Sequence, residues 1–299
     1  MQSIFNSNTL RGVLANSIVG LAASLAASGA FAYVIGGPEQ ADHPSSGNWN
    51  WDNGATTAPL RNALENPNFF GPTGVVEETV TTVAVDMDSA DPFATLDGFI
   101  VPWWLNSESA PYQAGIIDFF LNGGDLWLLQ DSNGRDGVGD DLGVGTLGQT
   151  AITPVNGTAP LFDGPFGTAT NVGQGGGQEG FLDEAGVLAN NGTIVGRNTE
   201  DQVIAAFWGP DQYATGAGAL IVVADIDMFT SQATIDGTFG TTFGDTVDDL
   251  NDNGIFTLNA FAFLATSEEP IGNPVPLPAT LAIFGLGLVA LGFTRRRRA

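Results

Sequence analysis

Short apolar runs rich in β-branched and aromatic residues recur along the middle of the chain, each bounded by Gly, Pro or Asp. Such runs are typical of strands buried in a parallel sheet. The predicted strands are residues 33–36, 79–85, 98–104, 125–130, 193–196, 203–208 and 220–224. Helical patterns lie at residues 56–65, 110–121 and 254–265. Because strands alternate with helices, we expect a mostly parallel sheet covered by helices on both faces.

The segment from residue 98 to residue 130 gives the clearest unit of this kind. Ser109 and Pro111 mark a helix start, and Gly123-Gly124 marks its end before the next strand. Strand, helix, Gly-Gly and strand in this order form one βαβ crossover. We therefore predict a doubly wound α/β domain over residues 33–266.

Two segments depart from this pattern. Residues 132–192 are rich in Gly, Pro, Asn and Thr, which predicts an insertion of loops or short β structure. Residues 267–275 are acidic and contain proline, as expected of a linker.

Three stretches carry a resemblance to a known fold family: DGFIVPWWLNSESAPYQAGIIDFFLNGGDLWLLQD, GAGALIVVADIDMF and NDNGIFTLNAFAFLA. Together they resemble the class I glutamine amidotransferase-like superfamily, and within it the non-catalytic or uncharacterised members. The resemblance implies a flavodoxin-like α/β fold. Catalytic members of that superfamily use a cysteine nucleophile, and this chain has no cysteine. Amidotransferase chemistry is therefore excluded.

The first 32 residues predict a signal peptide. Arg11 precedes an Ala-rich apolar stretch that ends at Ala30-Phe31-Ala32, a small-x-small cleavage signature for signal peptidase. We expect the mature chain to begin near Tyr33.

The last 24 residues, 276–299, predict a sorting signal that includes a membrane-spanning helix. A turn at Pro276, Leu277 and Pro278 leads into the apolar stretch 279–293. Four arginines follow: Arg295, Arg296, Arg297 and Arg298. Such a cluster stays on the cytoplasmic side of a bilayer. The stretch is short and contains glycines, which favours a temporary hold on the inner membrane over a permanent anchor.

This tail resembles the PEP-CTERM sorting signal of Gram-negative bacteria, although Leu277 stands where that signal usually has Glu. The resemblance implies that an exosortase, a membrane protease, processes the chain. The protein would then reach the cell surface or the extracellular matrix, where exopolysaccharide is a candidate partner. An ordinary C-terminal anchor is the alternative.

The charge of the chain further limits the classes of molecule that it can bind. The chain has 33 acidic residues and eight arginines, five of which lie in the two terminal segments. So acidic a surface repels nucleic acid, which we exclude as a partner. The excess of acidic residues is consistent with a saline habitat or with calcium binding. Composition alone does not distinguish these two explanations. Without cysteine there is no disulfide, no thiol nucleophile and no thiolate zinc site.

Two kinds of chemistry remain as hypotheses. Ser132 follows an apolar strand where a nucleophile elbow would sit, and His43 is the single histidine. A secreted serine hydrolase using this pair is the alternative to a non-catalytic binding or structural protein. The Ser132 segment lacks the first glycine of G-x-S-x-G, so a solvated turn is the simpler interpretation.

Calcium binding is the other hypothesis, and calcium is the one cofactor that the sequence suggests. Asp249, Asn251 and Asn253 place oxygen atoms at alternate positions before a glycine, as in the first half of an EF-hand loop. Ala260 stands where the bidentate Glu should be, so Asp252 or Asn253 as a helix cap is the competing interpretation. Asp225 and Asp227, which follow a predicted core strand, form a second candidate site.

Overall fold

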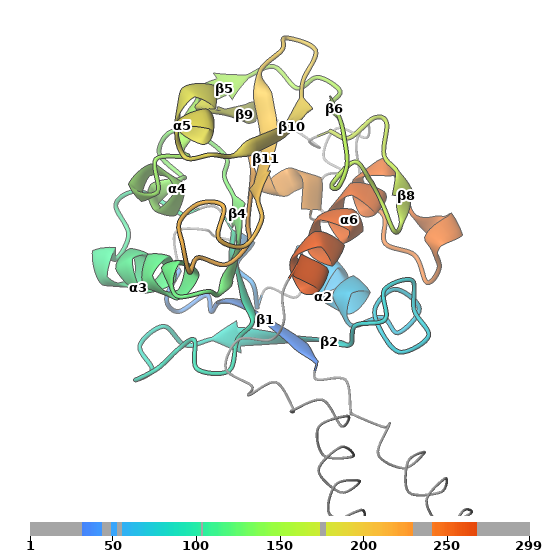
Figure 1. Ribbon diagram of the computed structural model, residues 1–299, viewed down its shortest axis with the longest axis horizontal. Helices are drawn as coiled ribbons and strands as arrows, with labels where there is room; N and C mark the ends of the chain where they lie inside the picture. Colours follow the sequence, from blue (N-terminus) through green and yellow to red (C-terminus); the bar gives the residue numbers. More distant parts are fainter. Residues whose placement is uncertain are drawn as a thin grey trace, which may run out of the picture. The chain divides into compact units, whose positions relative to one another are not determined.

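An eight-stranded sheet forms the centre of the domain (Figure 1). The computed structural model describes residues 32–43, 49–52, 56–102, 104–173, 178–229 and 241–267. The strand order is β2-β1-β3-β4-β12-β11-β10-β6. These strands are β1 (Tyr33–Pro38), β2 (Val80–Val85), β3 (Gly98–Pro102), β4 (Asp125–Leu129), β6 (Asn156–Gly157), β10 (Thr193–Arg197), β11 (Val203–Trp208) and β12 (Leu220–Val223).

One side of this sheet is parallel throughout. Strands β2, β1, β3, β4 and β12 all run in the same direction. Their spatial order is that of a flavodoxin-like sheet, in which the second strand lies outside the first and the later strands add on the opposite side. A mixed α/β fold with a large, mostly parallel central sheet is therefore confirmed.

The other side of the sheet corrects one prediction. The segments 193–196 and 203–208 form strands as expected, but β10 and β11 run antiparallel to each other, and β11 runs antiparallel to β12. For β10 and β11 the reason is their short connection: the turn from Asn198 to Gln202 is closed by Asn198 N–H donating to the Gln202 carbonyl. A parallel connection needs a crossover of a dozen or more residues, usually a helix.

Helices cover the two faces of the sheet (Figure 1). One face carries α2 (Ala58–Leu64) and α6 (Asp252–Ser267), and the other carries α3 (Ala110–Leu121), α4 (Gly137–Asp141) and α5 (Glu184–Ala189). Side chains alternate between the faces along β4. Trp127 packs in the core with Phe261 of α6, whereas Leu126 packs with Phe120 of α3. This period of two divides the apolar residues into two cores.

The predicted insertion at 132–192 contains short β structure. It forms two small antiparallel pairs, and β6 adds to the central sheet. The pairs join β5 (Thr146–Thr150) to β9 (Glu179–Leu182) and β7 (Asp163–Gly164) to β8 (Gly167–Thr168). The sequence patterns did not predict α4 and α5, because both span less than two helical turns and show little periodicity.

Two 3-10 turns complete the described elements, η2 (Ile226–Phe229) and η4 (Val247–Asp249). The predicted signal peptide, except for Ala32, and the predicted sorting signal 276–299 lie outside the described residues. Across the stretches that are described, we found no helix long and apolar enough to cross a membrane.

Candidate functional site

The carboxyl edge of the parallel strands gathers polar side chains from loops far apart in sequence. Strands β1 and β3 are hydrogen-bonded neighbours, yet the chain continues from β1 to β2 on the opposite side. Doubly wound sheets bind ligands beyond the carboxyl ends of their strands at such a switch point. The loops after β1, β2, β3 and β4 therefore define the candidate site.

His43 lies on the first of these loops. It follows β1, and its imidazole stacks on the indole of Trp104, which follows β3; the ring centroids are 4.4 Å apart. Its Nε2 atom lies 3.0 Å from Oε2 of Glu108. Both rings are buried, so the stack and the carboxylate together hold the imidazole in one orientation.

A small pocket adjoins this stack between the carboxyl ends of β3 and β4. Its walls include Val101 and Leu128 together with three buried polar residues, Trp104, Gln130 and Asp136. No described residue forms a hydrogen bond with Trp104 Nε1, with either amide atom of Gln130 or with Asp136 Oδ1. Each unpaired buried polar group costs about 1–3 kcal/mol. The pocket thus concentrates polar atoms whose hydrogen bonds are not made within the described fold.

The second oxygen of Asp136 has a structural role. Oδ2 accepts hydrogen bonds from the Thr146 amide and hydroxyl at 2.6 and 2.7 Å. Burial, followed by the charge of Asp136, raises the pKa of Asp140, although a hydrogen bond from Asn106 acts in the opposite direction. The carboxylate of Asp136 is therefore held in place with Oδ1 free for another contact.

Arg135 also lines the pocket, and its guanidinium donates to the Asp131 carboxylate at 2.7 Å. The arginine is about half exposed, whereas Asp131 is buried. The ion pair compensates much of the positive charge beside the pocket.

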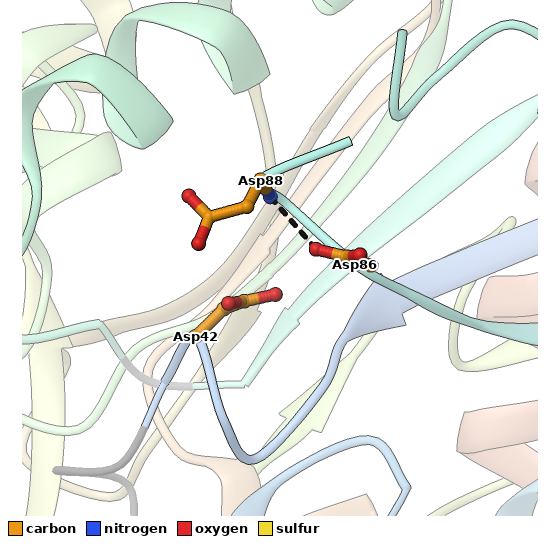
Figure 2. Close-up of side chains that lie close together, drawn as sticks. All are labelled: Asp42, Asp86 and Asp88. Carbon is orange, nitrogen blue, oxygen red and sulfur yellow. Dashed lines mark hydrogen bonds between the residues drawn. The ribbon is translucent and has the colours of Figure 1, made fainter. Parts of the chain in front are cut away.

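Three carboxylates form a separate cluster on the loops after β1 and β2: Asp42, Asp86 and Asp88 (Figure 2). One oxygen of each lies within 4.8 Å of the others. Asp86 accepts a hydrogen bond from the Asp88 amide at 2.9 Å, and Asp42 accepts one from the Met87 amide at 2.7 Å. Tyr112 donates its hydroxyl proton to Asp88, and this hydrogen bond is the main cause that raises the pKa of Tyr112 to about 12.

Hard cations prefer oxygen ligands of this kind, but exposed carboxylates alone do not define a metal site. The sequence analysis missed this cluster. Asp86 and Asp88 directly follow a predicted strand, and Asp42 follows the first strand closely. The signal was their place after two strands that the flavodoxin-like order makes neighbours.

Glu179 on β9 lies near the same edge of the sheet. A Cβ atom on the adjacent Gly180 would lie 2.5 Å from the Asp131 carbonyl and 3.3 Å from the Ala224 carbonyl, so β9 passes close to the ends of β4 and β12. Burial raises the pKa of Glu179 to about 7, although hydrogen bonds from Asn198 and Thr153 lower it. The carboxyl group therefore holds its proton to a higher pH than an ordinary glutamate.

The two residues of the hydrolase hypothesis both lie on loops at the carboxyl edge. The Ser132 carbonyl accepts hydrogen bonds from the amides of Gly134 and Arg135 at 2.7 and 2.9 Å, which closes a tight turn after β4. The described contacts of His43 are with Trp104 and Glu108. Use of the pair in catalysis stays a prediction.

The predicted calcium residues occupy two places. Asp225 is buried just beyond the end of β12, and Asp227 lies in η2. Asp249 accepts from the Thr246 amide and hydroxyl in a capping box at η4. Asn251 and Asn253 lie at the start of α6. Calcium binding at these residues stays a prediction.

The cap of α6 differs from the predicted one. Asn251, rather than Asp252 or Asn253, accepts a hydrogen bond from the Gly254 amide at 3.0 Å. The Asn253 side chain instead bonds to the backbone of Gly173 in both directions, accepting at 3.0 Å and donating at 2.7 Å. Asp252 accepts from the Thr170 amide at 3.1 Å. These contacts tie the insertion to α6.

Comparison with known proteins identifies a family motif near the C-terminus of the chain. Residues 274–298 match the family model described as the PEP-CTERM protein-sorting motif. The interpretation of the tail as a sorting signal is thereby confirmed. The motif implies processing by an exosortase membrane protease and an exported protein that is first anchored in a membrane and then reaches the cell surface. A search of curated proteins found no significant match.

Similar solved structures cover the α/β domain. The mmIFT52 N-terminal domain is 12% identical, with a TM-score of 0.50 over 79% of this chain and 99% of that one. A putative ThuA-like protein from Bacteroides uniformis ATCC 8492 is 10% identical, with a TM-score of 0.46 over 81% and 94%. Another from Parabacteroides merdae ATCC 43184 is 11% identical, with a TM-score of 0.42 over 79% and 91%. The first of these likenesses bears on the fold alone.

Proposed function

We propose that the chain is a non-catalytic binding or structural protein of a Gram-negative bacterium, delivered by an exosortase-type system to the cell surface or extracellular matrix. The observation that carries this proposal is the sorting motif at residues 274–298. Signal peptidase removes residues 1–32 during export, and the tail then holds the protein in the inner membrane until the exosortase acts.

The character of the domain supports this route. It contains neither lysine nor cysteine, and its acidic surface repels the anionic lipid of the membrane that it leaves. Exopolysaccharide is the partner that the destination favours, since the matrix consists largely of such polymers. The candidate site at the carboxyl edge supplies polar side chains for contact with such a ligand.

Cell fractionation tests the sorting proposal. The full chain would be produced in an exosortase-bearing host and in the same host lacking the enzyme. We expect surface or medium localisation in the first and membrane retention in the second. A variant with Arg295, Arg296, Arg297 and Arg298 replaced by alanine should lose retention and processing, because the arginines fix the tail in the membrane. Equal localisation in both hosts contradicts the proposal and favours an ordinary anchor.

The alternative function is a secreted serine hydrolase. The observation that favours it is the 3.0 Å contact between His43 Nε2 and Glu108, since a catalytic base is commonly oriented by a carboxylate. Hydrolysis of a panel of p-nitrophenyl esters that is lost in Ser132→Ala and kept in the exposed-loop variant Asn133→Ala would establish this alternative. No ester turnover above the variant background contradicts it.

A further inference from the structure

The pocket between β3 and β4 is built from elements that meet only in the folded protein. Val101 belongs to β3 and Leu128 to β4, while Trp104 and Asp136 are joined through backbone contact between their segments. Gln130 follows β4 and is 2% exposed. Residues from two stretches of the chain, 101–104 and 128–139, thus line one small space at the carboxyl edge of the sheet.

The polar atoms around this space offer both donors and acceptors. Trp104 Nε1 and Gln130 Nε2 are donors, whereas Gln130 Oε1 and Asp136 Oδ1 are acceptors. None of these atoms forms a hydrogen bond with any residue in the described parts of the chain. All three residues are at least 98% buried, so they do not depend on bulk water for their partners.

The mixture of donors and acceptors identifies the kind of group that fits. A metal cation is disfavoured, because the lining includes the indole N–H of Trp104, a donor whose positive hydrogen repels a cation. An anion is disfavoured by the Asp136 carboxylate, since Arg135, the cation in the lining, already pairs with Asp131. A neutral hydroxyl donates one hydrogen bond and accepts others, which matches the pocket.

The walls limit the size of what enters. A Cβ atom on Gly139 of α4 would lie 1.7 Å from Gln130 Nε2, so the amide packs directly against this glycine. With Val101 and Leu128 on the other walls, the space has room for one group of about the size of a water molecule, such as a hydroxyl, rather than for a whole sugar ring.

From these observations we infer that the pocket binds a hydroxyl group of an uncharged polyhydroxylated ligand, a polyol or a saccharide. The inference rests on the proposed function, because it supplies the contact by which a surface protein would hold a hydroxylated polymer. In the free protein the unpaired amide of Gln130 is a cost to stability, and the ligand removes that cost.

Calorimetric titration of the purified full chain tests the inference. The probes are glycerol, sorbitol, glucose and mannose, with calcium chloride and sodium acetate as charged comparisons. We expect binding of at least one hydroxylated probe, and Gln130→Met should weaken it roughly tenfold or more, because it removes both a donor and an acceptor. The matched change Gln149→Met, at an exposed position on β5, should leave the affinity unchanged.

A second readout separates ligand binding from a structural role of the amide. Without ligand, Gln130→Met should keep or raise the melting temperature, since it replaces an unpaired buried amide by an apolar group of similar size. If Gln130→Met does not fold, Asp136→Asn serves instead. It retains an oxygen for Thr146 and presents a donor to the pocket, so it should weaken binding by a similar factor.

Three results would overturn the inference: no binding of any hydroxylated probe, equal binding by the folded pocket variant, or a crystal structure with glycerol in which only water occupies the pocket. The same protein, taken from the exosortase-bearing host, is checked for C-terminal processing. Processing without binding removes this inference alone, whereas binding without processing removes the sorting proposal alone.

Discussion

The imidazole of His43 stacks on the indole of Trp104, with ring centroids 4.4 Å apart and ring planes 15° from parallel. Through this contact the loop after β1 is held against the loop after β3, at the point where the order of the sheet reverses. Trp104 also lines the neighbouring pocket. The single histidine of the chain therefore supports the geometry of the candidate site.

Replacement of His43 by alanine should destabilise the domain by about 3 kcal/mol, because it leaves a cavity in place of a buried ring. The stack on Trp104 and the 3.0 Å contact with Oε2 of Glu108 are lost as well. Urea unfolding followed by tryptophan fluorescence would measure the change. His43→Phe keeps an aromatic ring and should cost less than His43→Ala. An unchanged unfolding midpoint in His43→Ala would show that this contact contributes little.

The raised pKa of Glu179 predicts that the stability of the domain declines as the pH rises. Its pKa is near 7 in the folded protein and near its ordinary value of 4.5 when unfolded. Between these values the folded state holds a proton that the unfolded state releases, so the free energy of unfolding falls as the pH rises from 4.5 to 7. The part due to Glu179 is at most about 3 kcal/mol.

Glu179→Gln should remove this decline, because the amide stays neutral at every pH. Thermal melts between pH 4.5 and 8 measure the profile, and Glu77→Gln, an exposed change, is the control. A decline of equal size in Glu179→Gln and the parent protein would assign it to other groups.

The carboxylates of Asp42, Asp86 and Asp88 should repel one another at low salt (Figure 2). Asp86→Asn keeps an oxygen that accepts from the Asp88 amide while it removes one charge. We expect a higher melting temperature at low ionic strength, and a difference that disappears near about 1 M salt as screening sets in. Asp91→Asn is the control for the general effect of lower net charge. An equal gain in both variants would show that the cluster has no special repulsion.

Substitution of Asn251 tests whether this residue acts as a helix cap or as a calcium ligand. Because its side chain accepts a hydrogen bond from the Gly254 amide, Asn251→Ala should lower stability by about 1 kcal/mol. The loss should be the same in calcium and in EGTA, which chemical unfolding in both buffers would measure. A loss confined to the calcium buffer would instead support the calcium site predicted at Asp249, Asn251 and Asn253.

Local signals in the sequence predicted much of the fold. The helix 110–121 forms over the predicted residues, because Pro111 near its start and Gly123 beyond its end fix both boundaries locally. The seven predicted strands also form. Strand direction was less accessible: apolar runs do not encode it, and the short turn between β10 and β11 was the available indication of a hairpin.

The pocket was beyond sequence reasoning for a different reason. Trp104, Gln130 and Asp136 meet because β3 and β4 are neighbours in the sheet, and none of the three stands in a recognisable motif. Gln130 followed a predicted strand, but an unpaired amide is visible only when its surroundings are known. The capping residue of α6 was also beyond the sequence patterns, because adjacent Asp and Asn residues at its start are all suitable caps and only the structure shows which one is used.

The central claim is that an exosortase-type enzyme processes this chain at the motif spanning residues 274–298. Intact-mass spectrometry of the protein recovered from an exosortase-bearing host tests it most directly. We predict a mature chain that begins near Tyr33 and ends close to the Pro276-Leu277-Pro278 turn, without the four arginines. A recovered protein whose C-terminus is Ala299 would contradict the claim.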